Sequence, residues 1–209
     1  MISLHKVSNR LWDKPILKNI NWSTDLGQSW AILGPNGAGK STLIKVILGQ
    51  LPYCGTIKRA AQISTFDKIA YVSLEQQKIL VAREEKKDRY EEYSGKEQHS
   101  LSGHEFIDPE GKQAEKVLET AEQLGIAAIL EKPLRHFSNG ETRKTIIAKA
   151  LLANPRLLIL DEPFDGLDSA SSKWLSQSIS GLIQSGLAIW LVSHRFEELV
   201  PEIEHVLCL

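Results

Sequence analysis

A glycine-rich loop near the start of the chain ends in lysine, serine and threonine, a spacing suited to phosphate chemistry. The sequence from Gly34 to Thr42 reads GPNGAGKST. Its glycines let backbone N–H groups turn toward phosphate oxygens, and the helix expected after the loop presents its positive N-terminal end. Lys40 is expected to reach the β- and γ-phosphates of a nucleotide, and the Ser41 hydroxyl to bind Mg²⁺. The predicted phosphate contacts are Gly34, Asn36, Gly37, Gly39, Lys40, Ser41 and Thr42.

Two carboxylates, Asp161 and Glu162, directly follow the apolar run Leu157 to Leu160. An apolar strand that ends in acid delivers a carboxylate from the core of a sheet to a metal ion, so Asp161 is predicted on the Mg²⁺ side. Glu162 is suited to polarise an attacking water, a role in which position matters more than basicity. Two acids after a strand are often an ordinary exposed turn, but the phosphate loop favours the catalytic interpretation.

His194 follows the apolar run Leu187 to Ser193. It is therefore predicted at the carboxyl end of a strand, where ligands gather in open α/β sheets, and near the γ-phosphate. A histidine at a strand end is more often a structural hydrogen-bonding group. That structural role is assigned to the other histidines, including His136 and His205.

The elements that must position these residues alternate between helix and strand. Short β-rich runs fill residues 1 to about 33, and helical spacing follows from Lys40 to Gly49. Later strands are expected at Ile69 to Ser73, Leu157 to Leu160 and Leu187 to Ser193, and later helices at Gly140 to Leu152 and Ser169 to Ile183. This alternation predicts an α/β fold with a mainly parallel sheet core and an N-terminal antiparallel β part.

Residues from about 77 to 135 are predicted to form a helical insert. The densely charged run Arg83 to Gln98 suits a solvated helix or a mobile loop. Helical apolar spacing returns in Lys112 to Leu124 and in Ala127 to Leu130. We therefore expect one domain, 1–209, with its core at about 1–76 and 136–209.

Composition restricts the location and the partners of the chain. The 209 residues carry a formal net charge of −1, which gives no electrostatic attraction to nucleic acid or anionic lipid. The distant Cys54 and Cys208 favour a reducing compartment and are expected to be buried. Without a leader or a long apolar stretch, a cytoplasmic protein is predicted, with a peripheral position at the inner membrane face as the alternative.

These motifs, in this order, resemble those of the ATP-binding cassette (ABC) ATPases over essentially the whole chain. The resemblance implies a P-loop NTPase cassette with a helical subdomain, and a signature segment of LSGGQ type before the helix that leads to the second acidic motif. Phe137 to Glu141 (FSNGE) occupies that place. Leu101 to Glu105 (LSGHE) looks closer in letters but lies in the wrong place, so it is interpreted as a coincidental turn.

The resemblance also implies that the signature segment of one cassette binds the γ-phosphate of ATP held by a second, in a homodimer or a tandem chain. Ser138 and Gly140 would make that contact. Asn139 stands where the family usually has glycine, which predicts weak or asymmetric hydrolysis. The loop Asp165 to Asp168 resembles the segment that contacts the partner cassette.

Two further positions rest on the resemblance alone. Gln76 resembles the glutamine that links the metal to the helical subdomain, with Glu75 as the alternative. Trp12 resembles the aromatic that stacks on adenine, and core packing is the alternative role for it.

Within the family, the stretch from Asn139 to Ser171 looks most like the ModF-like tandem cassette proteins associated with molybdate transport or photorepair. The chain is then the first half of a longer protein, or a separate subunit. Three functions stay open: an ATP-hydrolysing subunit that serves a separate membrane transporter subunit, a soluble ATPase acting as a switch on nucleic acid or the ribosome, and a low-turnover ATP sensor. The fold alone does not choose among them.

Overall fold

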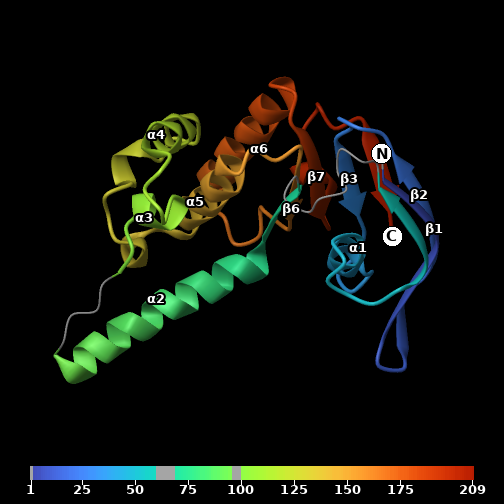
Figure 1. Ribbon diagram of the computed structural model, residues 1–209, viewed down its shortest axis with the longest axis horizontal. Helices are drawn as coiled ribbons and strands as arrows, with labels where there is room; N and C mark the ends of the chain where they lie inside the picture. The colour runs from blue at the N-terminus through green and yellow to red at the C-terminus, as the bar shows by residue number, and fades with distance from the viewer. Residues whose placement is uncertain (1, 60–68, 96–99) are drawn as a thin grey trace. The chain divides into compact units, whose positions relative to one another are not determined.

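The computed structural model describes residues 2–59, 69–95 and 100–209. Its contacts divide the chain into two compact units (Figure 1). We call the first the sheet unit; it comprises Met1–Tyr71, Pro155–Glu162 and Ile179–Leu209. The second, the helical unit, comprises Val72–Asn154 and Pro163–Ser178 and so extends beyond the insert expected at about 77–135.

An antiparallel sheet of three strands holds the N-terminal part of the sheet unit, as the sequence predicts. Its order is β2 (Lys14–Thr24), β1 (Ile2–Leu11), β4 (Cys54–Arg59). The sequence gives little sign of β4, because this edge strand is largely exposed and carries no alternating apolar pattern. Its first residue, Cys54, is exposed, as is Cys208, so the expectation of two buried cysteines is wrong.

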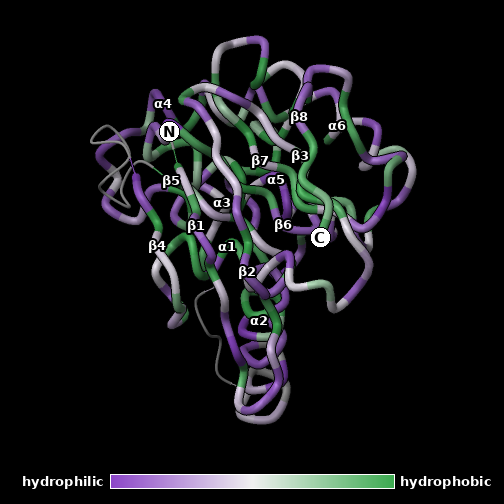
Figure 2. Tube along the Cα trace, turned by 90° about the vertical axis from the view of Figure 1, so that its right-hand side faces the viewer, coloured by the Kyte–Doolittle hydropathy of each residue, from purple (hydrophilic) through white to green (hydrophobic). Residues whose placement is uncertain are grey.

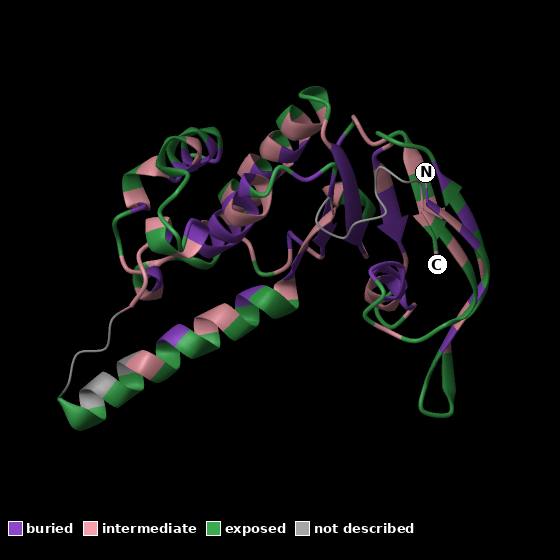
Figure 3. Cartoon of the chain, in the orientation of Figure 1, coloured by how far each residue is buried: buried purple, intermediate pink, exposed green. Residues whose placement is uncertain are grey.

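The second sheet of this unit has the strand order β5-β6-β7-β3-β8. Its members are β5 (Ile69–Ser73), β6 (Leu157–Asp161), β7 (Ala188–Ser193), β3 (Trp30–Leu33) and β8 (His205–Cys208). The pairs β6/β7, β7/β3 and β3/β8 are parallel. Every residue of β6 and β7 is buried, as expected of strands covered on both faces (Figure 3). Figure 2 shows the hydropathy of the residues along the same chain. The predicted α/β fold is confirmed.

One apolar core joins the two sheets and α1 (Lys40–Ile47). The helix buries Leu43, Ile44, Val46 and Ile47, and the same core contains Trp22 and Trp190, with Trp30 packed against it. The ring centroids of Trp22 and Trp190 lie 4.8 Å apart, and those of Trp22 and Trp30 lie 5.2 Å apart. Helix α1, which follows the glycine-rich loop, is thus anchored in this core.

The helical unit contains α2 (Leu74–Ser94), α3 (Gly103–Ile107), α4 (Ala114–Gln123), α5 (Asn139–Leu152) and the start of α6 (Ser169–Gln184). The charged run predicted as helix or loop is helix α2 as far as Ser94, and its last residues, 96–98, lie outside the described residues. Ala127–Ile129 is a short 3₁₀ helix with Leu130 as its C-cap, where the sequence predicts helical spacing. No helix in the described ranges has the length and apolar character needed to cross a bilayer.

Candidate active site

The phosphate loop runs from the end of β3 to the start of α1, as predicted. Gly39 is the N-cap of α1 and adopts a φ of +97°, a left-handed conformation that favours glycine. A Cβ at Gly34 would lie 2.6 Å from the carbonyl oxygen of Leu209, whereas one at Gly37 would meet nothing within 4 Å. Glycine at position 34 is therefore required by close packing, and Gly37 borders open space in which a phosphate has room.

Lys40 lies along the inside of this loop. Its side chain is buried, and Nζ donates hydrogen bonds to the carbonyl oxygens of Gly34 at 2.8 Å and Pro35 at 3.2 Å. Nζ also lies 3.2 Å from Oε1 of Glu162. The ammonium group is thus held by two carbonyl oxygens of the loop and by one carboxylate.

Asp161 joins the loop to the end of β6. The Ser41 hydroxyl donates to its Oδ1 at 3.1 Å, and the Tyr71 hydroxyl donates to its Oδ2 at 2.7 Å. Burial raises the pKa of Asp161, and the two hydroxyl hydrogen bonds act against that shift. A hydroxyl and a carboxylate oxygen side by side are the hard oxygen ligands that Mg²⁺ prefers, so these residues fit the ion. Sequence reasoning did not find Tyr71, although its place near the end of a predicted strand could have indicated it.

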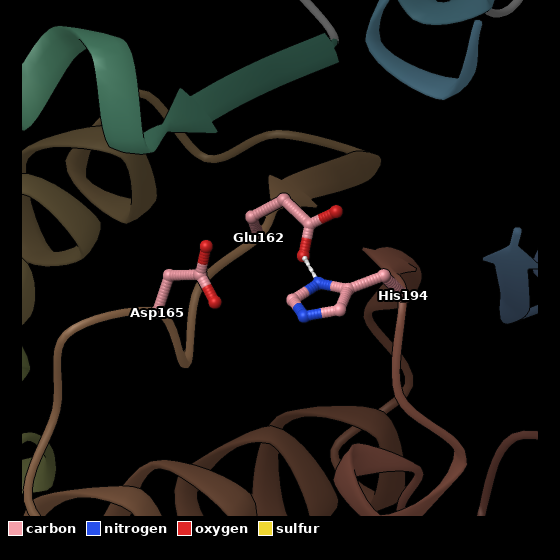
Figure 4. A group of neighbouring side chains, drawn as sticks. All are labelled: Glu162, Asp165 and His194. Atoms are coloured by element: carbon pink, nitrogen blue, oxygen red, sulfur yellow. Dashed lines mark hydrogen bonds and ion pairs between the residues drawn. The ribbon is translucent and has the colours of Figure 1, made fainter. Parts of the chain in front are cut away.

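Glu162 and His194 form a hydrogen-bonded pair at the ends of neighbouring strands (Figure 4). The His194 Nδ1 atom lies 2.9 Å from Oε2 of Glu162, and the Nε–H of Arg195 donates to His194 Nε2 at 3.1 Å. Since Nε2 accepts that bond, the proton of the neutral ring is on Nδ1 and points at Glu162. Glu162 has a φ of +51°, which a residue with a Cβ adopts only at a cost.

The sheet unit therefore brings together five predicted residues: Lys40, Ser41, Asp161, Glu162 and His194. Thr42 lies in the first turn of α1, and Asn36 is exposed on the loop. Trp12 stands at the tip of the hairpin between β1 and β2 and is 93% exposed, so the alternative of core packing is wrong for it.

Ser138 and Gly140 open helix α5 in the helical unit. The Ser138 hydroxyl accepts a hydrogen bond from the N–H of Glu141 at 3.2 Å, and the Ser138 N–H donates to the Glu141 carboxylate at 2.7 Å. Gly140 is buried, and a Cβ there would lie 2.8 Å from Oγ of Ser171. Asn139 is exposed between them.

The look-alike segment Leu101 to Glu105 is not a turn, as the sequence suggested, but the start of helix α3. Ser102 and Glu105 form the same reciprocal capping pair as Ser138 and Glu141. The two segments look alike in sequence because both have a serine followed three residues later by glutamate, which is the pattern of a capped helix start. Helix capping alone therefore cannot identify a signature segment.

Gln76 and its neighbour Gln77 lie in the first turn of α2. The exposed Gln76 side chain accepts a hydrogen bond from the N–H of Ser73 at 3.2 Å. Gln77 is 4% exposed, donates to the carbonyl oxygen of Asn139 at 3.1 Å and accepts from Arg143. Sequence reasoning missed Gln77 and Arg143, because spacing along a helix does not show which polar side chains are buried.

Known proteins resemble this chain over most of its length. The family model described as "ABC transporter" matches residues 17–165. The ABC transporter ATP-binding protein ModF of Escherichia coli (strain K12) is 39% identical over 194 residues, which is 92% of this chain but 39% of ModF. The zinc import ATP-binding protein ZnuC of Photorhabdus laumondii is 32% identical over 211 residues, 100% of this chain and 74% of ZnuC. The chain thus spans about two fifths of ModF and most of ZnuC.

Solved structures show the same fold. A nucleotide-free ATP-binding cassette from an ABC transporter superposes with a TM-score of 0.78 at 19% identity, covering 100% of this chain and 87% of that one. The cbiO1 protein of Clostridium perfringens, part of the transporter complex cbiONQ, gives a TM-score of 0.76 at 22% identity, covering 99% and 83% of the two chains. At these identities the likeness is evidence of fold alone.

Proposed function

This chain belongs to the ABC transporter family, whose members hydrolyse ATP, and from that premise we propose that it binds and hydrolyses MgATP as the ATP-binding component of a transport system. The observation that carries the proposal is the position of Glu162. One carboxylate meets both the lysine of the phosphate loop, at 3.2 Å, and the strand-end histidine, at 2.9 Å. A glycine-rich turn without catalytic function does not require that convergence.

The residues of the sheet unit divide the work between binding and chemistry. Backbone N–H groups of the loop and Lys40 would hold the phosphates, and Ser41 and Asp161 would hold Mg²⁺. When bound, the ion neutralises charge that develops on the phosphate oxygens. Phosphate binding draws Lys40 away from Glu162, which frees the carboxylate to orient a water molecule.

His194 positions Glu162 in this scheme. Its Nδ1–H donates to Oε2, and this leaves Oε1 to accept the proton of the water once Lys40 has moved. Arg195 holds the ring in the required tautomer from the other side. Three assignments stay proposals on the family pattern: Trp12 against adenine, Gln76 toward the metal, and Ser138 with Gly140 toward the nucleotide of a second cassette.

The test is a comparison of nucleotide binding and turnover in the purified chain. Glu162→Gln is expected to reduce turnover at least about a hundredfold and leave ATP binding intact, because the amide keeps its shape but accepts no proton. Lys40→Ala is expected to lose binding itself. Glu110→Gln, which changes an exposed carboxylate, serves as the control. Equal turnover in wild type and Glu162→Gln would remove the hydrolase function and leave an ATP-binding sensor.

A second cassette is part of the proposal, because the family pattern implies that the signature segment of one cassette meets the nucleotide of another. ATP is expected to drive the Glu162→Gln variant into a dimer, measured by light scattering. If the variant binds ATP and remains monomeric at every concentration, the partner is not a copy of this chain. A tandem cassette is then the candidate.

The transport role is assigned from the relatives, with molybdate as the first candidate cargo because identity to ModF is higher than identity to ZnuC. The location that follows is the cytoplasmic face of a membrane, on a transporter subunit. Affinity isolation from membranes, followed by ATPase assays with molybdate or zinc, tests the assignment. Copurification with ribosomes or nucleic acid in place of a membrane protein would favour the soluble switch.

A further inference from the structure

Arg143 is a buried cation in the helical unit that neither hydrolysis nor nucleotide binding explains. It lies in the first half of α5 and is 1% exposed. Burial lowers the pKa of Arg143 from its usual range to about 10, and the charge of Asp165 acts in the opposite direction. The side chain therefore stays charged at neutral pH, and its burial is expensive unless its N–H groups are matched by acceptors.

The acceptors come from two other segments of the helical unit. The Nε–H donates to Oε1 of Gln77 in α2. One terminal nitrogen, Nη1, donates to the carbonyl oxygen of Pro163 at 2.5 Å, and the other, Nη2, lies 3.4 Å from the carbonyl oxygen of Asp165. A planar guanidinium presents its donors in fixed directions, so these contacts fix α2 and the loop Pro163 to Asp165 relative to α5.

Gln77 extends the connection to the start of α5. While its oxygen accepts from Arg143, its amide nitrogen donates to the carbonyl oxygen of Asn139 at 3.1 Å. Gln77 is itself buried, at 4% exposed. An amide is suited to this place because it accepts on one side and donates on the other. The four groups form one hydrogen-bonded chain, from Asn139 through Gln77 and Arg143 to the loop.

Both ends of this chain of hydrogen bonds lie in segments with a proposed role. Asn139 stands between Ser138 and Gly140, the residues proposed to meet the nucleotide of a second cassette. Pro163 directly follows Glu162, and Asp165 begins the loop expected to contact that cassette. We propose that Arg143 and Gln77 are positioning residues that hold the signature segment and the loop after Glu162 in one arrangement, so that both meet the second cassette together.

This inference rests on the proposed function, since it assigns a role within assembly of the two-cassette site. The alternative is that Arg143 only stabilises the helical unit. The two differ in a measurable way. A stabilising residue affects all activities in proportion to the folded fraction, whereas a positioning residue changes assembly and turnover in protein that is fully folded and binds nucleotide normally.

The experiment uses Arg143→Lys, Gln77→Leu and their combination, each alone and with Glu162→Gln. Lysine keeps the charge but loses the planar donors, and leucine removes both bonds of Gln77. Gln77 lines a cavity of about 450 Å³ with Leu74, Val81 and Ala82, so the leucine variant has room to relax and fold. Lys144→Met is the matched control, because Lys144 is the next residue on α5 and contacts the Trp174 ring at 3.6 Å.

The expected result is a tenfold or larger fall in kcat and in ATP-driven dimerisation, with nucleotide affinity within twofold of wild type. The combined variant is expected to lose no more than the worse single variant, because both residues act in one chain of bonds. Lys144→Met is expected to keep dimerisation and kcat. Circular dichroism and thermal unfolding establish that each protein is folded at the assay temperature.

Unchanged kcat and dimerisation in a folded Gln77→Leu variant would overturn the proposal, whether or not Arg143→Lys folds. So would losses from the two residues that simply add. Failure of the proposed function itself would look different, because wild type would then neither hydrolyse ATP nor dimerise.

Discussion

The hydroxyl of Tyr71 donates a 2.7 Å hydrogen bond to Oδ2 of Asp161, and this bond fixes the carboxylate with its other oxygen toward Ser41. Each hydroxyl group thus bonds one oxygen of the Asp161 carboxylate. Ser41 is on the side where Mg²⁺ is expected, and Tyr71 bonds the oxygen on the other side. Mutation of a group that holds a metal ligand in this way commonly lowers metal affinity by about 10- to 100-fold.

Tyr71→Phe is therefore expected to raise the Mg²⁺ concentration at the midpoint of nucleotide binding by about tenfold. The change removes one oxygen and keeps the ring, so the fold is retained. Binding of a fluorescent ATP analogue, titrated with Mg²⁺, measures the effect, and binding without metal is expected to be unchanged. Tyr53→Phe, at a tyrosine that is 39% exposed, is the control. An identical Mg²⁺ midpoint in wild type and Tyr71→Phe would contradict the role.

Ser138→Ala and Ser102→Ala remove equivalent helix caps, one in the proposed signature segment and one in the segment that resembles it. Each is expected to lower the free energy of unfolding by about 1 kcal/mol. Turnover is expected to fall strongly in Ser138→Ala and to stay near wild type in Ser102→Ala. Urea unfolding and ATPase assays on the same preparations measure both. A larger loss of turnover in Ser102→Ala would mean that the signature segment lies at Leu101 to Glu105.

Gly140→Ala is expected to destabilise the protein by about 1–3 kcal/mol, because the new Cβ would lie 2.8 Å from Oγ of Ser171. Gly181→Ala is the matched change, since that exposed glycine of α6 has nothing within 4 Å of its Cβ position. It is expected to stabilise by about 0.5–1 kcal/mol. The denaturant midpoints of the two variants and of wild type measure both effects. If Gly140→Ala stabilised the protein as Gly181→Ala does, the contact with Ser171 would be shown to relax at no cost.

Asp161→Asn is expected to stabilise the protein at neutral pH, measured in chelator and without nucleotide. Burial raises the pKa of Asp161 in the folded state, so the folded protein holds this proton to higher pH than the unfolded chain does. The free energy of unfolding then falls as pH rises from the ordinary carboxyl pKa through the raised one. The advantage of Asp161→Asn is thus largest above this window and shrinks as pH falls. An advantage that does not depend on pH would contradict this cause.

Asn139→Gly is expected to raise turnover, because the glycine typical of the family removes a side chain that would crowd the shared nucleotide. The bond from Gln77 reaches the backbone oxygen of Asn139, so it survives the change. ATPase rates in the two proteins, with nucleotide affinity as a control, measure the effect. No change in rate would remove the idea that Asn139 slows hydrolysis.

The sequence predicted the elements that carry strong local patterns. The strands β6 and β7 appear as continuous apolar runs because both their faces are buried, and the loop before α1 appears as glycines because its backbone needs them. Edge strand β4 did not appear, since an exposed strand needs no apolar pattern. The helix start at Ser102 was mistaken for a turn because turns and helix caps use the same residues.

The partners of the site residues were beyond prediction for a different reason. Lys40, Ser41, Asp161, Glu162 and His194 each belong to a motif, but Tyr71, Gln77 and Arg143 act through contacts between distant segments. Such contacts depend on how helices and strands meet in space. No local pattern marks a buried polar side chain in advance.

The left-handed backbone of Glu162, with its φ of +51°, has a consequence for anyone who engineers this protein. Glycine or asparagine tolerates that conformation better, and replacement by glycine would relieve about 1 kcal/mol or more of strain. A stability screen blind to ATP would therefore select against the proposed catalytic carboxylate. Libraries of thermostabilised variants of this cassette need a turnover assay in the first round of selection, because the most stable variants are expected to include inactive ones.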